Sequence, residues 1–157
     1  MAIRNLRYEG DPLLRKISKE VKEITPRIKE LVQDMLDTMY EDEGVGLAAP
    51  QVGILKQMVV MDVGEGPLVL INPVILETSG EQTGQEGCLS YPGKAADVTR
   101  PMHVKCKYYD LDMNEVIVEA DELFARCICH ELDHLHGVLY TDHVTGPVYD
   151  TNYEEEE

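Results

Sequence analysis

The stretch RCICHELDHLHG, residues 126–137, decides the fold, because its apolar residues recur at helical spacing and its glycine marks a helix end. It contains His130 and His134, four residues apart, with Glu131 beside the first histidine. Side chains at this spacing project from one side of an α-helix, close enough to bind a single metal ion, and the carboxylate between them is a candidate base. The pattern predicts a helix that carries a catalytic metal site.

A helical wheel places the two histidines on the apolar side of this helix. At about 100° per residue, His130, His134 and Cys127 fall within roughly 40° of Leu123. Because the two histidines share the apolar face with leucine, this placement argues against ordinary solvent-exposed side chains. The short motif by itself also arises by chance in proteins without a metal site. The opposite half is mostly polar and suits solvent or a strand edge, with Glu122, Arg126, Cys129, Asp133 and His136.

Length and composition predict one globular domain. The chain has 157 residues, 43% of them hydrophobic and 28% charged, which is enough to bury a single core. Its formal net charge of -16 repels phosphate backbones and anionic membrane surfaces. We therefore expect neither nucleic acid nor a membrane as a direct partner.

The ends of the chain and its cysteines indicate a cytoplasmic protein. The N-terminus lacks the apolar run of a signal peptide, and no stretch reaches the length of a membrane span. Cys88, Cys106, Cys127 and Cys129 are enough for two disulfides, but in a reducing compartment we expect thiols or metal ligands. We expect a single catalytic domain over residues 1–148, followed by an acidic, flexible, solubilising tail over residues 149–157.

The order of elements predicts an α+β fold. Asp11-Pro12 and Thr25-Pro26 are helix starts, and the second begins an amphipathic helix that ends near Gly44. Strands are expected over residues 58–63, 68–76, 103–109 and 115–120, with polar or irregular chain over 80–93 and Asp121 as the cap of the histidine helix. We predict antiparallel β-sheets packed around that central helix, with an N-terminal amphipathic helix.

A third metal ligand must come from elsewhere in the chain, because a catalytic site of the zinc type takes three protein ligands and leaves one position for water. Asp142 and His143 follow the helix closely, whereas His136 points to its opposite face. Cys88 lies in a glycine-flanked break from a strand and is the best upstream candidate. The glycine-rich segment 44–53 contains one side-chain amide, that of Gln51. Such a segment lets a ligand or another stretch of backbone approach closely, and a tight structural loop would require the same glycines.

Three motifs together resemble the peptide deformylase family. They are GVGLAAPQ (residues 44–51), EGCLS (86–90) and HELDH (130–134), in the same order and at compatible spacing. The DPLLR segment at 11–15 and the GVLY segment at 137–140 are also similar to that family, so the resemblance spans nearly the whole chain.

This resemblance implies removal of the N-formyl group from the initiator methionine of nascent peptides. It implies that Cys88, His130 and His134 bind one divalent metal ion, Fe²⁺ in the cell with Zn²⁺, Ni²⁺ or Co²⁺ as substitutes. It further implies that Glu131 moves protons, while Gln51 and the backbone N–H of Leu89 stabilise the oxyanion. The peptide is expected as an added strand, with its methionine in an apolar pocket. The substrate-binding residues that it implies are Gly44, Val45, Gly46, Glu86, Gly87, Leu123 and Cys127. For Cys127 the sequence fits a small buried core residue equally well.

Some positions depart from the family pattern. Cys129 stands where many members have glutamine before the first metal histidine, and its wheel position faces away from the ion. Lys94 is the nearest substitute for an arginine that in some members meets the carboxylate end of the peptide. The acidic C-terminus offers no basic helix for docking on the ribosome, so we expect proximity to the ribosome without that contact, and a monomer.

Two other functions compete with deformylation. A small metallopeptidase of the same histidine motif would cleave internal bonds of unformylated peptides. A peptide-binding module with a structural metal would need a fourth Cys or His ligand, and no motif supplies one.

Overall fold

The computed structural model describes residues 3–151 of the chain. Within these residues the α-helices are α1 (Pro26–Glu41) and α2 (Glu122–Leu135). Short 3₁₀ turns are η1 (Pro12–Arg15), η2 (Ala49–Val52) and η3 (Tyr140–Asp142). None of the described helices is long and apolar enough to cross a membrane.

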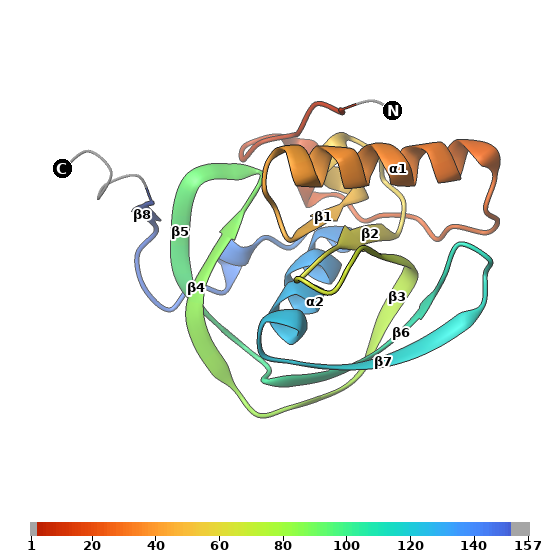
Figure 1. Ribbon diagram of the computed structural model, residues 1–157. Helices are drawn as coiled ribbons and strands as arrows, with labels where there is room; N and C mark the ends of the chain where they lie inside the picture. The colour runs from red at the N-terminus through yellow and green to blue at the C-terminus, as the bar shows by residue number, and fades with distance from the viewer. Residues whose placement is uncertain (1–2, 152–157) are drawn as a thin grey trace.

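The strands form two antiparallel sheets, as predicted for the α+β class. The larger sheet has the order β1-β2-β3-β6-β7, and the smaller one the order β4-β5-β8. Figure 1 shows α2 in the middle of the fold, with the two sheets around it and α1 across the outer face of β1 and β2. The strands are β1 (Gly46–Ala48), β2 (Met58–Met61), β3 (Leu68–Ser79), β4 (Gln82–Cys88), β5 (Tyr91–Arg100), β6 (His103–Tyr109), β7 (Glu115–Asp121) and β8 (Tyr149–Asp150).

Strand β2 separates the two halves of the core. Met58 and Val60 pack with the apolar face of α1, whereas Val59 and Met61 pack with α2 on the other side. All four side chains are buried, which explains the continuous apolar run in this strand. Burial of each side chain contributes about 1.5–3 kcal/mol to the stability of the fold. Val59 and Met61 therefore hold α2 against this face of the sheet.

The hairpin of β4 and β5 was not predicted. The sequence analysis expected a polar turn over 80–84 and irregular chain over 86–93, yet Gln82–Cys88 and Tyr91–Arg100 pair in register from Gln82↔Arg100 to Gly87↔Ala95. These strands have few β-branched residues, and it is cross-strand pairing and burial against α2 that stabilise them. The register shifts between Gly87 and Cys88, which turns the cysteine out of the regular ladder.

Two smaller expectations differ from the structure. Asp121 occupies the N-cap position of α2, but its side chain makes no cap hydrogen bond and contacts His103 instead. The acidic tail was expected to begin at residue 149, whereas Tyr149–Asp150 form β8 and pair with Lys94 and Ala95. The predicted tail residues 152–157 lie outside the described part of the chain.

Gly137 ends α2 in a conformation that other residues rarely adopt. Its φ is 75°, and a Cβ at this position would lie 2.6 Å from the carbonyl carbon of Arg15. We therefore expect Gly137→Ala to lower the free energy of unfolding by about 2 kcal/mol or more, because both the backbone and the docked η1 segment must shift. Urea denaturation of metal-free protein measures this effect. An unchanged midpoint would show that the contact with Arg15 relaxes at no cost.

His103 predicts a pH dependence of stability. Its Nδ1 lies 2.7 Å from Asp121 Oδ1 and its Nε2 lies 3.1 Å from Glu119 Oε1, so only the imidazolium donates to both carboxylates. These bonds raise the pKa of His103, and the stabilisation is therefore complete below pH of about 6.5 and is lost as pH rises through the folded-state pKa. The difference in unfolding free energy between wild type and His103→Gln should shrink from pH 6 to pH 9. A constant difference would contradict this.

Candidate active site

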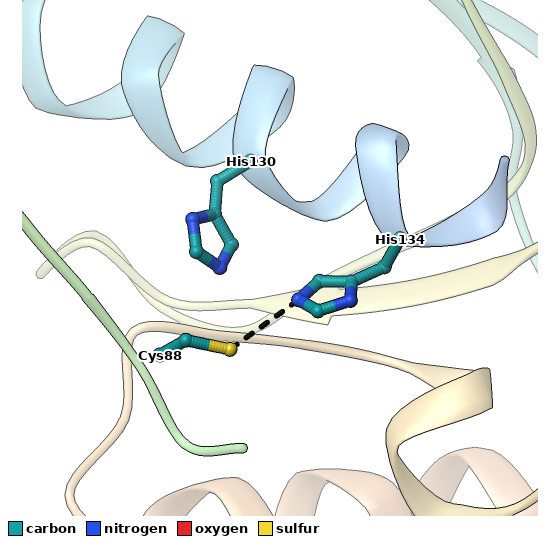
Figure 2. Close-up of side chains that lie close together, drawn as sticks. All are labelled: Cys88, His130 and His134. Carbon is teal, nitrogen blue, oxygen red and sulfur yellow. Dashed lines mark hydrogen bonds between the residues drawn. The ribbon is translucent and has the colours of Figure 1, made fainter. Parts of the chain in front are cut away.

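Three potential metal ligands converge beside α2. The ligand atoms of Cys88, His130 and His134 all lie within 4.8 Å of one another, and Cys88 Sγ is 3.3 Å from His134 Nε2. Figure 2 shows both rings projecting from one side of the helix towards the sulfur at the end of β4. The helical wheel predicted the shared face, and the alternatives Asp142 and His143 are not part of this group of donors.

A buried carboxylate fixes the ring of His130. Glu86 Oε1 lies 2.5 Å from His130 Nδ1, which leaves Nε2 of that ring directed to the site. The ring of Tyr140 also stacks on His130, with centroids 5.9 Å apart and an interplanar angle of 26°. His130 therefore has one nitrogen and one ring face occupied by the protein, and these contacts restrict its rotation.

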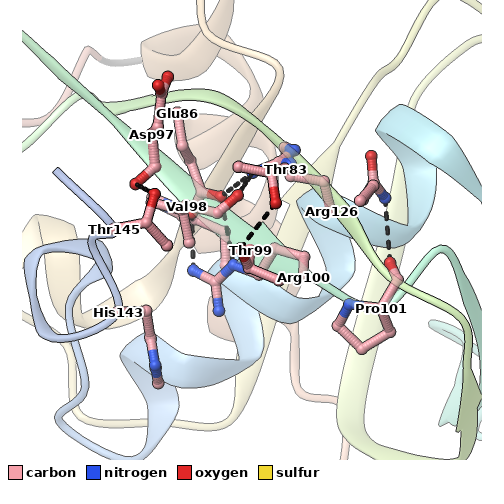
Figure 3. Close-up of polar contacts among 12 residues, drawn as sticks. Thr83, Glu86, Asp97, Val98, Thr99, Arg100, Pro101, Arg126, His143 and Thr145 are labelled. Carbon is pink, nitrogen blue, oxygen red and sulfur yellow. Dashed lines mark hydrogen bonds and ion pairs between the residues drawn. The ribbon is translucent and has the colours of Figure 1, made fainter.

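Glu86 is part of a buried charge network (Figure 3). Arg100 donates to both of its oxygens at 2.6 and 3.2 Å, and Arg126 donates to Oε2 at 2.7 Å and to the Val98 carbonyl at 3.1 Å. Burial would raise the pKa of Glu86, but the contacts with His130 and Arg100 outweigh it and hold the pKa far below its usual range. The carboxylate therefore stays charged.

This network changes the expectation for Glu86 as a substrate-binding residue. Both carboxylate oxygens are engaged by protein groups, and the side chain is buried, so its position suits orientation of His130. The network also contains Asp133, whose Oδ2 accepts a hydrogen bond from Arg100 Nη1 at 2.7 Å. Nε2 of His143 lies 3.2 Å from Oδ2 of Asp133, so this histidine contacts the outer end of the network.

Glu131 is the buried carboxylate next to the donor group. Its Oε2 is 4.0 Å from His130 Nε2, and its Oε1 is buried with no hydrogen-bond partner among the described residues. Burial raises the pKa of Glu131 to about 7, although the neighbouring His130 acts to lower it. A carboxyl group with a pKa near neutrality can both accept and deliver a proton at the pH of a cell.

The glycine loop gives this carboxylate its space. A Cβ at Gly46 would lie 2.6 Å from Glu131 Oε2 and 2.9 Å from Cys127 Sγ, and a Cβ at Gly44 would lie 2.7 Å from Leu89 Cδ1. Real Cβ atoms essentially never come this close to other heavy atoms. A side chain at Gly46 or Gly44 would therefore force Glu131, Cys127 or Leu89 to shift, because this part of the chain lies close to α2 and to the segment after β4.

Gln51 is held with its amide nitrogen towards the site. The backbone N–H of Ala48 donates to Oε1 at 2.9 Å, so this oxygen is identified as the acceptor and Nε2 faces the other way. Nε2 lies 3.4 Å from Cys88 Sγ and 3.1 Å from Ser90 Oγ. An amide N–H donor is therefore positioned beside the candidate metal ligands.

A cavity of about 530 Å³ opens onto this group of residues. Its lining includes every residue that the sequence analysis assigned to substrate binding. Val45 and Leu123 are 44% and 51% exposed, so they contribute to the open part, whereas Cys127 is buried and burial raises the pKa of its thiol well above the usual value. Cys127 is thus an uncharged wall of the cavity. Leu6, Tyr8 and Tyr91 also line it and were not predicted.

The donor set fits a bound divalent metal ion. One sulfur and two imidazole nitrogens are the ligands that transition metals such as iron, cobalt, nickel and zinc accept. Burial lowers the pKa of His134 well below its usual value, which keeps that ring neutral, the form that binds metal. Among the described residues no fourth Cys or His joins the group, and Cys88 and His130 line the cavity.

Among the residues around the site, the sequence analysis was least accurate for the burial of Arg126. The helical wheel put Arg126 and Cys129 on a half suited to solvent or a strand edge, but both are buried, Arg126 against Val98 of the smaller sheet and Cys129 in the core cluster that includes strands of the larger sheet. Apolar periodicity cannot reveal a buried arginine, because its partner Glu86 lies forty residues away in the chain. The only signal was the expectation that a strand could face this half of the helix, and Arg126 does donate to the Val98 carbonyl of β5, the central strand of the smaller sheet.

Comparison with known protein families gives one clear match. Residues 3–148 match the family model described as polypeptide deformylase. A peptide deformylase of Agathobacter rectalis is 63% identical over 155 residues, which cover 99% of this chain and 98% of that protein. A peptide deformylase of Lachnoclostridium phytofermentans is 58% identical over 161 residues, covering 100% of this chain and 99% of the relative.

Solved structures agree with these relatives. The crystal structure of peptide deformylase from Thermotoga maritima superposes with a TM-score of 0.91 at 41% identity, covering 93% of this chain and 100% of that one. The Synechococcus elongatus peptide deformylase, solved in complex with actinonin, gives a TM-score of 0.87 at 48% identity and covers 90% of this chain and 78% of that one. The similarity therefore extends across the sheets and helices that build the site.

Proposed function

This chain belongs to the peptide deformylase family, and on that premise we propose that it removes the N-formyl group from the initiator methionine of newly made polypeptides, releasing formate. The family is one of metal-dependent hydrolases, and the chain has a possible metal site. The observation that carries the proposal is the convergence of Cys88, His130 and His134 beside the unpaired carboxylate of Glu131 at the cavity.

Cys88, His130 and His134 are proposed to hold one divalent ion, with Fe²⁺ as the cellular metal and Zn²⁺, Ni²⁺ or Co²⁺ as substitutes. When bound, such an ion supplies Lewis acidity and lowers the pKa of neighbouring water towards neutrality. Glu86 keeps the ring of His130 oriented for this task. Metal analysis of protein purified without air would identify the ion.

Glu131 is proposed to move the proton. It accepts a proton from the attacking water on Oε1, the atom without a protein partner, as the water oxygen bonds to the formyl carbon. It then delivers this proton to the amide nitrogen as the carbon–nitrogen bond breaks. Cleavage gives formic acid and a free α-amino group, and the acid loses its proton to solvent or to the amine to become formate, so the carboxylate of Glu131 ends as it began.

Gln51 and Leu89 are proposed to stabilise the negative charge that develops on the formyl oxygen. The amide of Gln51 is fixed by Ala48 before substrate arrives, so its N–H needs no reorganisation at the moment of reaction. The backbone N–H of Leu89 is the second proposed donor. A preorganised donor of this kind contributes about 10²–10³ in rate.

The peptide is proposed to bind as an added strand. Strand β1 is an edge of the larger sheet and β4 is an edge of the smaller one, and residues of both line the cavity. Main-chain hydrogen bonds to such edges hold a peptide without regard to its sequence. Gly44, Val45 and Gly46 on one side and Gly87 on the other are the proposed contacts, with the methionine side chain near Leu123 and Cys127.

We also propose a cytoplasmic location and a monomer. The four cysteines are free thiols, which suits a reducing compartment. All proposed metal ligands come from one chain, so assembly of the site needs no second copy. The formal net charge of -16 repels the phosphate backbone of RNA, so we propose that the enzyme acts near the ribosome without direct contact with nucleic acid.

The test is formate release from a formyl-methionyl peptide by protein purified without air. We expect turnover that depends on the bound ion and stops after chelation, with recovery when Ni²⁺ or Co²⁺ is added. The same preparation should leave the internal bonds of the unformylated peptide intact. Cleavage of internal bonds would favour a metallopeptidase, and stoichiometric metal without either activity would favour a metal-stabilised binding module.

A further inference from the structure

A second cavity lies at the opposite end of α1 from the candidate active site. Its volume is about 420 Å³, within the range of about 300–1,000 Å³ in which proteins hold small molecules. Residues at the start of α1 line it, whereas Asp42 and Glu43, which follow α1, line the active-site cavity. The helix is about 24 Å long, and no described residue lines both cavities. A ligand of the second cavity is therefore distinct from the proposed substrate.

The apolar part of this cavity is aliphatic. Four branched side chains line it, namely Val21, Ile28, Leu31 and Ile54, and the first three are buried. Among the described residues that line it none is aromatic, so no ring is offered on which a nucleobase or another flat ligand could stack. This lining suits an alkyl chain.

The rim of the cavity carries one uncompensated positive charge. The charged residues that line the cavity are Arg4, Glu20, Lys22, Glu23, Arg27 and Lys56. Arg4 is paired with Asp34 at 3.0 Å, and the other five are exposed and form no ion pair among the described residues. Three of these five are cations and two are acids, so a single negative charge balances the rim. This local excess contrasts with the formal net charge of -16 for the whole chain.

Hydrogen bonds fix two of the segments that line the cavity. Asn72 Oδ1 accepts from the Val21 N–H at 2.8 Å, and Asn72 Nδ2 donates to the Val21 carbonyl at 2.7 Å. The Arg4 N–H donates to Thr38 Oγ1 of α1 at 2.8 Å, and its guanidinium is held by Asp34 of the same helix. The cavity is therefore preformed, and a ligand does not have to order these segments when it binds.

We propose that this cavity binds a small monocarboxylate with an unbranched alkyl chain, the chemical class of a medium-chain fatty acid. The chain packs on the aliphatic lining, and the carboxylate meets the three rim cations Lys22, Arg27 and Lys56. A guanidinium such as that of Arg27 can donate two parallel hydrogen bonds to a carboxylate. The two rim acids disfavour a group with several negative charges, such as a phosphate monoester. This binding site is independent of the proposed deformylation and takes no part in its chemistry.

The test uses octanoate as the probe, with binding to zinc-loaded protein followed through backbone amide chemical shifts. A ligand of this size is expected to bind with a Kd of about 1 mM at low salt. Hexanoate should bind about tenfold more weakly, because each methylene that leaves water is worth up to about fourfold in affinity. Neutral octanamide should also bind about tenfold more weakly, since exposed ion pairs each contribute about 1.5- to 5-fold. In 0.5 M NaCl the difference between octanoate and octanamide should fall to about twofold, because salt screens exposed charges.

Two pairs of substitutions assign the binding to the rim. Lys22→Gln combined with Arg27→Gln should weaken octanoate about fivefold and leave octanamide within about 1.5-fold of wild type. The control pair Lys16→Gln and Lys29→Gln removes the same charge from exposed sites outside the lining of either cavity. It should change the affinity for octanoate by less than about 1.5-fold. All four positions are exposed, so the fold should tolerate both pairs.

The positions of the shifted amides locate the ligand. Octanoate should shift the amides of Val21, Ile28 and Ile54, while those of Gly46 and Leu89 at the active-site cavity stay in place. Shifts confined to the active-site cavity, or no saturable binding up to 20 mM, would overturn the inference. Equal affinity for octanoate and octanamide, or a control pair that weakens octanoate as much as the rim pair, would overturn it too. None of these results bears on deformylation, which formate release tests separately.

Discussion

Glu131→Gln is expected to lower kcat by about 10²–10⁴-fold while the protein keeps its bound metal. The glutamine fills the same volume and leaves the proposed ligands Cys88, His130 and His134 intact, but it cannot carry a proton between water and the leaving nitrogen. Loss of the proton carrier acts on the chemical step, so KM for a neutral formylated peptide should change much less than kcat. Metal analysis and formate release on the same sample measure both effects.

A second readout of Glu131→Gln is independent of activity. Burial raises the pKa of Glu131 to about 7, so ionisation of this carboxylate destabilises the metal-free fold progressively as pH rises above the ordinary carboxyl pKa of about 4.3, and the loss is complete above about pH 7. Glutamine has no charge to desolvate, and we expect the variant without metal to be more stable than wild type by about 1–3 kcal/mol at pH 8. Undiminished turnover would eliminate Glu131 as the proton carrier, and loss of metal would make it a structural residue.

Local sequence patterns predicted the elements that carry the site. The helix over 122–135, the helix starts at Thr25-Pro26 and the strands around β2, β3, β6 and β7 follow from apolar spacing and capping residues that act within a few positions. His130 and His134 share a face for the same reason. Cys88 was predicted only as the best of several third ligands, because its approach to α2 depends on the turn after β4.

Long-range pairing explains what the sequence analysis missed. The β4–β5 hairpin is built from polar residues whose pattern resembles a loop, and it is stable because Arg100 and Arg126 anchor it through Glu86 to α2. An isolated buried ion pair is seldom a net gain in stability, but truncating one partner leaves a charge without compensation. No local sequence pattern reveals such a network, because its members lie far apart in the chain.

Cys88→Ala is expected to remove the metal and with it the activity. Two histidines remain, but the site loses the one ligand that is a thiolate, and affinity should fall by well over 100-fold, since even outer partners of metal ligands change it by about 10–100-fold. Metal content after dialysis should drop from one ion per chain towards zero. In protein loaded with Co²⁺, the absorption band that reports sulfur coordination should disappear.

Cys129→Ala is the matched control for this prediction. It removes a thiol of α2 that lies next to His130 in the chain but is not part of the donor group. Metal content and the cobalt–sulfur band should therefore be retained. Cys88→Ala protein that still binds one ion with an unchanged band would show that the coordinating sulfur is not that of Cys88. Loss of metal in both variants would instead indicate general disruption of α2. Because Cys88 reaches the donor group from the end of β4 whereas both histidines lie on α2, retention in one variant and loss in the other would tie the metal directly to the end of β4.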